Sequence, residues 1–190
     1  MENVVFIPEP VDEWNNITDK DGETILSKFY KNTSKYSFAF QMMAYITRLS
    51  KTIEIIQNNP NCIFITERAL NTDKFVFCKM LYDSGFIDEI EYKIYNKWFD
   101  EFNSIPISNY IYIKSDPDIC YTRVLQRNRT GEESITKEYL HNCNNYHEKW
   151  LSKLDNVVSF DGNLDKNSDI YKKSITDEII KYIQKLAKNL

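Results

Sequence analysis

The sequence predicts an α/β fold, a parallel sheet with helices on both faces, on the basis of two patterns. Short apolar runs rich in β-branched and aromatic residues, such as residues 4–7 and 62–66, are typical of buried strands. Longer stretches with apolar residues at helical spacing lie between these runs. Strands that alternate with helices in this way are typical of a parallel sheet covered by helices.

Composition limits the class of protein. The chain has 190 residues, 42% of them hydrophobic, which suits a single domain over residues 1–190 with a substantial core. A net charge of −4 argues against a general nucleic-acid binder. Four scattered cysteines and two histidines indicate neither disulfides nor a metal site. With no membrane-span pattern and no signal peptide, we expect a soluble cytoplasmic protein without a membrane partner.

The first third of the chain begins with a strand at residues 4–7. Two prolines hold Glu9 between them at the end of this strand, and Pro10 keeps the backbone at Glu9 extended. Residues 23–31 are predicted to form a helix, and a longer helix is predicted from about residue 36 to residue 57. Gln41, Ala44 and Arg48 form one stripe along the longer helix. Such a stripe by itself is typical of a solvated face.

The central strand, residues 62–66, ends in Glu67 and Arg68. A helix start is predicted at residues 71–72, and Asp73 and Phe77 then share one helix face. Ligands of parallel α/β sheets bind beyond the carboxyl ends of the strands, so these side chains are aimed at one crevice. The simpler alternative is a surface arginine and an aspartate that favours the helix dipole.

The second half continues the alternation of elements. Residues 89–102 form an amphipathic helix dense in aromatic residues, which is expected to pack against the core or a partner chain. Asp116 and Pro117 are a typical helix start after a strand at residues 109–114. The remaining predicted elements are a helix at residues 135–151, a strand at residues 157–160 and a terminal helix at residues 168–190.

Three arginines gather around the end of the helix that follows Pro117. Arg123 and Arg127 are one turn apart, and Arg129 comes two residues later, before Gly131, which indicates a mobile loop. Guanidinium groups suit multiply anionic ligands such as phosphate, and arginine rather than lysine stands at all three positions. The alternative is basic residues placed near a helix C-terminus.

Four stretches together resemble one family, the deoxyribonucleoside kinases of the deoxycytidine and deoxyguanosine kinase type, which are related to herpesviral thymidine kinases. The resemblance covers nearly the whole chain, and its order and spacing are consistent. The residues that carry it are Pro8–Val11 with Trp14, Ser37–Gln41 with Arg48, Glu67 and Arg68 with Asp73, and the three arginines followed by Glu132, Tyr139 and His147–Leu151.

The resemblance implies roles on the nucleoside side. Glu9 would be the general base that takes the proton from the 5′-hydroxyl, and Arg68 would hold Glu9 and that hydroxyl in place. Gln41 would pair with the base edge, beside a pair formed by Arg48 and Asp73, whose carboxylate would accept from an exocyclic amine. The other substrate-binding positions are Trp14 and Phe77 against the base, Tyr30 and Glu132 at the sugar 3′-hydroxyl, and Leu26 and Phe29.

The resemblance also implies a lid over the ATP phosphates, formed by Arg123, Arg127 and Arg129. Counting back from Tyr139 makes Glu132 the sugar-binding acid, with Glu133 as the alternative. The family begins with a strand and a glycine-rich phosphate loop, whereas none of the glycines here, at positions 22, 85, 131 and 162, belongs to such a loop. We therefore expect a P-loop kinase fold that lacks the first strand and loop.

The absence of the family's first strand would also affect the sheet. Without a strand between them, residues 62–66 and 109–114 either pair directly or leave a gap with two exposed edges. We expect residues 1–190 alone to be marginally stable and to show little kinase activity.

The leading functional expectation is transfer of the γ-phosphate of ATP, with Mg²⁺, to the 5′-hydroxyl of a deoxynucleoside by a homodimer formed through helices. Deoxycytidine or a purine is favoured over thymidine, because Asp73 would oppose a carbonyl on thymine. The alternative is a non-catalytic nucleoside-binding or regulatory subunit. A nucleoside monophosphate kinase is disfavoured, since a phosphate acceptor calls for positive charge at Glu9.

Overall fold

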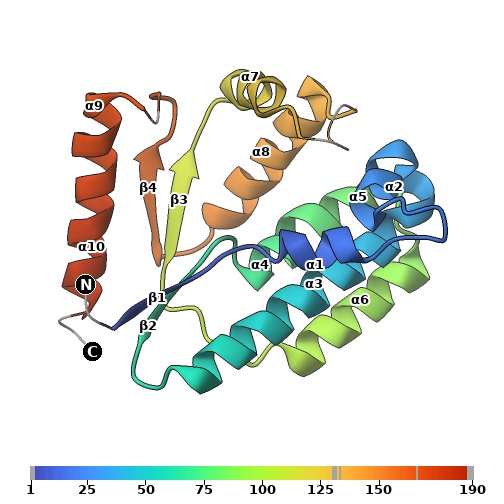
Figure 1. Ribbon diagram of the computed structural model, residues 1–190, viewed down its shortest axis with the longest axis horizontal. Coiled ribbons are helices and arrows are strands. Elements are labelled where there is room, and N and C mark those ends of the chain that lie inside the picture. The colour runs from blue at the N-terminus through green and yellow to red at the C-terminus, as the bar shows by residue number, and fades with distance from the viewer. Residues whose placement is uncertain (1–2, 130–131, 133, 166, 188–190) are drawn as a thin grey trace.

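The computed structural model describes residues 3–129, 132, 134–165 and 167–187 and has four strands in this part of the chain (Figure 1). β1 (Val4–Ile7) pairs in parallel with β2 (Ile63–Thr66), and β3 (Tyr110–Lys114) pairs in parallel with β4 (Val157–Asp161). Parallel pairing and the α/β class are confirmed. Among the described residues β2 and β3 do not pair, so the strands form two separate two-stranded sheets.

The first half of the chain holds a group of helices beside β1 and β2. These are α1 (Val11–Asn16), α2 (Ile25–Lys31), the long α3 (Thr33–Asn58), the short α4 (Leu70–Thr72), η1 (Asp73–Cys78), α5 (Lys79–Asp83) and α6 (Glu89–Phe102). The helix expected from residue 71 begins at Leu70, and η1 is a π-helical stretch that the sequence pattern did not reveal.

The second half surrounds β3 and β4 with helices. Figure 1 shows α7 (Pro117–Arg127) and α8 (Lys137–Leu151) on one side of these strands. The other side is covered by α9 (Asp169–Tyr171), η2 (Lys172–Thr176) and α10 (Asp177–Ala187), which follow one another directly. In the described residues no helix is both long enough and apolar enough to cross a membrane.

Side-chain caps explain where most of the longer helices begin. A polar side chain just before the first turn accepts a hydrogen bond from a backbone N–H that has no partner within the helix. Asp88 and Glu91 form a reciprocal capping box at the start of α6. Single caps begin four other helices: Thr24 at α2, Asn32 at α3, Asp116 at α7 and Thr136 at α8.

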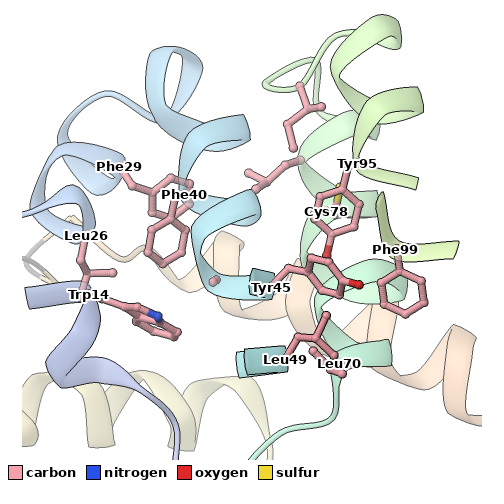
Figure 2. Close-up of a cluster of buried hydrophobic side chains, with 13 residues drawn as sticks. Trp14, Leu26, Phe29, Phe40, Tyr45, Leu49, Leu70, Cys78, Tyr95 and Phe99 are labelled. Atoms are coloured by element: carbon pink, nitrogen blue, oxygen red, sulfur yellow. The ribbon is translucent and has the colours of Figure 1, made fainter. Parts of the chain in front are cut away.

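The main core lies among α1, α2, α3, α5 and α6 (Figure 2). The ring of Phe29 stacks on Phe40 with centroids 4.6 Å apart, and Trp14 meets Phe40 edge-on at 5.6 Å. Farther along α3, Tyr45 packs against Tyr95 of α6. This aromatic packing fixes α3, and therefore the side chains that α3 directs toward β1 and β2.

A second cluster links the two sheets. Val76 of η1 is fully buried with Trp150 and Leu151 of α8, and Tyr110 of β3 packs against Trp150. Because η1 follows β2 and α8 precedes β4, this cluster joins the two halves of the fold.

Candidate active site

A buried arginine lies at the centre of the residues that the sequence singled out. Arg48 of α3 is 4% exposed. Its Nε donates to Oδ2 of Asp73 at 2.8 Å, and its Nη2 donates to Oε1 of Glu9 at 2.9 Å. The expected pairing with Asp73 is present, while the bond to Glu9 was not predicted. The stripe formed by Gln41, Ala44 and Arg48 is buried, so the expectation of a solvated face was wrong.

Electrostatics favour the charged form of Arg48. Burial lowers the pKa of Arg48, but Asp73 and Glu9 raise it, and the net shift is upward. Burial raises the pKa of Asp73, and the charge of Arg48 opposes that shift. A buried charge is tolerated when it is paired and hydrogen-bonded, as both groups are here.

Arg68 stands at the carboxyl end of β2 in an uncommon backbone conformation. Its φ of 65° is in the left-handed region, which non-glycine residues other than asparagine and aspartate seldom adopt and which is one form of backbone strain found at functional sites. The guanidinium carbon lies 4.5 Å from the ring centre of Phe77, a cation–π contact. Its Nη1 is 3.4 Å from Oε1 of Glu9. Arg68 is half-exposed and can therefore reach a ligand.

Glu9 thus faces two guanidinium groups. The Glu9 backbone N–H also donates to Oε2 of Glu67 at 3.3 Å, which fastens the end of β1 to the end of β2. Of the side chains expected in one crevice, Arg68 contacts Phe77 of η1, and Asp73 of η1 binds Arg48. Glu9, which follows β1, joins them through both arginines. π-Helical turns often occur at functional sites, and this one presents Asp73 to Arg48.

Gln41 is the clearest sign of a missing hydrogen-bond donor. Its side chain is 3% exposed, and its Oε1 is buried without a partner among the described residues. It lies two turns before Arg48 on the same face of α3. A buried acceptor left without a donor costs about 1–3 kcal/mol, so a ligand donor at this position would remove a real penalty.

The aromatic residues expected against the base divide into two groups. Phe77 is half-buried and touches Arg68. Trp14, Leu26 and Phe29 are members of the main core, and the Trp14 indole N–H donates to Oγ1 of Thr47 at 2.9 Å. The Trp14 ring also lies 5.7 Å from the guanidinium carbon of Arg48, so this tryptophan forms the wall behind Arg48.

The sugar-binding positions and two of the lid arginines lie together. Glu132 is 7% exposed and binds Arg127 at 2.6 Å and Arg129 at 3.4 Å. Burial and the nearby charge of Glu132 raise the pKa of Tyr30 to about 12, so its hydroxyl keeps its proton and can donate. Gly131, expected in a mobile loop, and Glu133, the alternative to Glu132, lie outside the described residues.

Arg123 is separated from the other two arginines by its contacts. Its guanidinium donates to Oγ of Ser115 at 3.2 Å and to the carbonyls of Asn163 at 3.2 Å and Leu164 at 2.9 Å. These bonds hold the segment after β4 against the end of β3. A cavity of about 390 Å³ lies at the same carboxyl ends, where parallel α/β sheets usually bind ligands; its lining includes Lys114, Ser115, Asp116, Asn144, Asp161 and Asn163.

His147 is a half-buried residue to which the sequence pattern gave no role. Its Nδ1 lies 2.7 Å from the carbonyl of Cys143, which can only accept, so Nδ1 carries the proton. Its ring packs edge-on against Phe77. Burial lowers the pKa of His147, and Arg68 nearby acts in the same direction.

The described residues contain no cluster of three or more histidine, cysteine, aspartate or glutamate side chains placed to hold a metal ion. The side chains of Arg127 and Arg129 are partly exposed, and guanidinium groups suit phosphate oxygens.

Comparisons with known proteins agree with this geometry. The sequence model of the deoxynucleoside kinase family matches residues 1–188. A fowlpox virus protein named "Probable deoxycytidine kinase" is 39% identical over 150 residues, which cover 77% of this chain and 61% of that protein. The deoxycytidine kinase of Mus musculus is 28% identical over 181 residues, covering 84% of this chain and 70% of that protein.

A third relative, deoxycytidine kinase 2 of Gallus gallus, is 30% identical over 204 residues, covering 92% of this chain and 76% of that protein. The chain thus spans between about three fifths and three quarters of the length of these relatives. On the family match and on these identities, the chain belongs to the deoxynucleoside kinase family.

Proposed function

We propose that this protein takes part in deoxynucleoside phosphorylation, in which the γ-phosphate of ATP passes to the 5′-hydroxyl of a deoxynucleoside. The observation that carries the proposal is the unpaired, buried Oε1 of Gln41 on the same helix face as the Arg48–Asp73 pair. An acceptor and a carboxylate so placed suit the donor-bearing edge of a nucleobase, and Glu9 beyond Arg48 suits a hydroxyl.

The proposed chemistry assigns few groups to the reaction. Glu9 accepts the 5′-hydroxyl proton, and Arg68, half-exposed and 3.4 Å from Glu9, orients that hydroxyl and meets negative charge on the phosphoryl group. Phosphoryl transfer depends mainly on positioning and charge stabilisation, which two guanidinium groups around one carboxylate supply. ATP brings Mg²⁺ with it, and Arg127 and Arg129 turn from Glu132 toward its phosphates.

The proposed base preference follows from one carboxylate oxygen of Asp73 that can still accept a hydrogen bond. Its Oδ2 receives Nε of Arg48 at 2.8 Å, whereas its Oδ1 has only a 3.5 Å contact with Nη2. Oδ1 can therefore accept from an exocyclic amine, as on cytosine, adenine or guanine. Thymine would place a carbonyl there and leave two acceptors facing each other, so we propose deoxycytidine or a purine deoxynucleoside as substrate.

Calorimetry tests this proposal with deoxycytidine, deoxyadenosine, deoxyguanosine and thymidine titrated separately into the protein. Heat of binding is expected for deoxycytidine or a purine and not for thymidine at the same concentration. Replacing Arg48 and Asp73 together with small apolar residues should relax that preference. Tighter binding of thymidine than of deoxycytidine by the unchanged protein contradicts the assignment of Asp73.

A second candidate function is a nucleoside-binding or regulatory subunit without catalysis. It is favoured by the state of the arginines, since Arg127 and Arg129 are bound to Glu132 and Arg123 is bound to backbone carbonyls. Titration with ATP separates the two candidates. Nucleoside binding without ATP binding supports the regulatory role, and binding of both supports the kinase.

We also propose that two copies associate through α3 and α6. A groove of about 590 Å³ runs between these helices, lined by apolar side chains such as Leu49, Ile53 and Phe102. Ile94 and Trp98 of α6 and Ile46 of α3 are all more than 40% exposed, an unusual number of large apolar groups on adjoining helices. Light scattering should give twice the mass of one chain, and Trp98→Glu should reduce the measured mass to that of one chain. Lys93→Glu, on an exposed residue of α6 that pairs with Glu89 outside the groove, is the matched control.

The proposed location is the cytoplasm. All four cysteines, Cys62, Cys78, Cys120 and Cys143, are free thiols, as expected in a reducing compartment.

A further inference from the structure

We propose that Arg48 couples recognition of the base by Asp73 to the placement of the general base Glu9, so that Asp73 is a positioning residue for the 5′-hydroxyl end of the site. This inference rests on the proposed function and extends it. A correct base would then do more than bind, because it would also set the carboxylate that receives the hydroxyl proton.

The first support is that one nitrogen is shared between the two carboxylates. Nη2 of Arg48 lies 2.9 Å from Oε1 of Glu9 and 3.5 Å from Oδ1 of Asp73. The direction in which the N–H groups of Nη2 point therefore depends on both acceptors. A base amine that donates to Oδ1 competes with Nη2 for that oxygen, and Nη2 is then left to Glu9 alone.

The second support is that Arg48 has little freedom to relax in another way. Its side chain is 4% exposed, its Nη1 donates to the carbonyl of Glu67 at 3.4 Å, and the ring of Trp14 stands 5.7 Å from its guanidinium carbon. A buried guanidinium cannot exchange a lost partner for water without a large penalty. A change in the bond between Arg48 and Asp73 therefore alters the bond between Arg48 and Glu9.

The third support is that the other contact of Glu9 is weaker. Arg68 lies 3.4 Å from the same Oε1 and is 39% exposed, so solvent screens that pair. The charged groups around the Glu9 carboxylate are Arg48 of α3, Arg68 and Glu67 after β2, and Asp73 of η1. Of the two arginines, Arg48 makes the shorter bond to Glu9, and it is the one that also donates to Asp73.

The experiment measures the contribution of the 5′-hydroxyl to binding, which does not require phosphoryl transfer. Calorimetry compares 2′-deoxycytidine with 2′,5′-dideoxycytidine in the unchanged protein and in Asp73→Asn. The loss of affinity on removing the hydroxyl is the measured quantity. Because directly coupled groups are non-additive, we expect this loss to differ between the two proteins by about fivefold or more.

Gln41→Met is the matched control, since Gln41 is proposed to meet the base and is not among the hydrogen-bond partners of Arg48 in the described residues. It should weaken both ligands and leave the loss on removing the hydroxyl unchanged. Arg48→Lys is a second test, because a single ammonium cannot donate in the fork that reaches both carboxylates. It should alter the loss as Asp73→Asn does, with thermal melting used to verify that each variant is folded.

The possible outcomes distinguish a failure of the coupling from a failure of the proposed function. Suppose that deoxycytidine binds, and that removing the 5′-hydroxyl costs the same affinity, within twofold, in the unchanged protein, in Asp73→Asn and in Arg48→Lys. The coupling is then wrong, and the proposed function stands. If the unchanged protein binds no deoxynucleoside, the proposed function and the coupling are both overturned. An equal change in Gln41→Met overturns the coupling too, because it shows a general disturbance of the site.

Discussion

Arg127 donates two hydrogen bonds to Oε2 of Glu132, from Nη2 at 2.6 Å and from Nε at 3.2 Å. Arg129 approaches the other oxygen at 3.4 Å. The acid expected at the sugar and two arginines expected at the phosphates thus neutralise one another. Both guanidinium groups are nevertheless more than 40% exposed, so each can meet an anion from the solvent side.

Arg127→Ala is predicted to weaken ATP binding by roughly tenfold, the worth of one charge-assisted hydrogen bond of about 1.5 kcal/mol. Deoxynucleoside binding should change less, because Arg129 still faces Glu132. Calorimetry with ATP and with deoxycytidine gives both numbers. Arg123→Ala is the comparison, since its bonds to Ser115, Asn163 and Leu164 predict a lower melting temperature. Equal losses for both ligands in Arg127→Ala would show that Arg127 is structural.

The sequence predicted much of this site because its residues stand at the ends of strands and on one helix face. Glu9 and Arg68 end β1 and β2, and parallel strands bring such ends together whatever the details of the core. The pairing of Arg48 with Asp73 was implied by the family resemblance and not by this reasoning, and the structure shows it. Bounds of β1 and α6 agree with the predicted residues, because prolines and a capping box define them in the sequence.

Other features depend on contacts that periodicity does not contain. The π-helical turn of η1 and the left-handed backbone at Arg68 are backbone conformations that no hydrophobic pattern records. The bond between Arg48 and Glu9 joins residues 39 positions apart. The stripe of Gln41 and Arg48 on α3 looked solvated because only the fold shows that α3 packs against α1, α2 and η1.

Glu9→Gln is predicted to lower turnover by about 10²- to 10⁴-fold, the usual contribution of a positioned base. Glutamine keeps an oxygen for Arg48 and Arg68, so deoxynucleoside affinity should change little. The measurement is deoxycytidine phosphorylation by protein in which a glycine-rich phosphate loop precedes β1, with binding measured in parallel. Glu67→Gln, which alters the neighbour that receives the Glu9 backbone N–H, is the control and should retain turnover. Turnover near normal in Glu9→Gln would remove Glu9 from the mechanism.

His147 predicts an acid-dependent loss of stability. Burial lowers the pKa of His147 below its ordinary value of 6.5, so the unfolded chain takes up a proton at a pH where the folded protein does not. The contribution to stability is therefore complete above about pH 6.5 and declines as the pH falls through the folded value, by about 1.4 kcal/mol for each unit of separation.

Urea unfolding between pH 5 and pH 8 measures this dependence. His147→Asn retains a donor for the Cys143 carbonyl but does not titrate, so its free energy of unfolding should depend less on pH than that of the unchanged protein. His141→Asn, at an exposed position of α8, is the matched control and should leave the pH dependence as it is. An identical slope in all three proteins would contradict the assignment to His147.

The separation of the two sheets gives the last prediction. β2 and β3 each pair on one side only among the described residues, and unpaired strand edges expose backbone N–H and C=O groups. A parallel strand that fits between β2 and β3 would satisfy both edges, and a glycine-rich loop after it would offer backbone N–H groups to phosphate oxygens. We propose to join such a strand and loop, taken from a related kinase, ahead of β1.

The extended protein should melt at a higher temperature and phosphorylate deoxycytidine, whereas the 190-residue chain should show little activity. A matched extension with the loop glycines and lysine replaced by alanine should keep the gain in melting temperature and lose the activity, because only the strand pairs with β2 and β3. Full activity of the 190-residue chain would show that its own residues hold the phosphates, with the cavity beside Lys114 and Ser115 as the place to look for them.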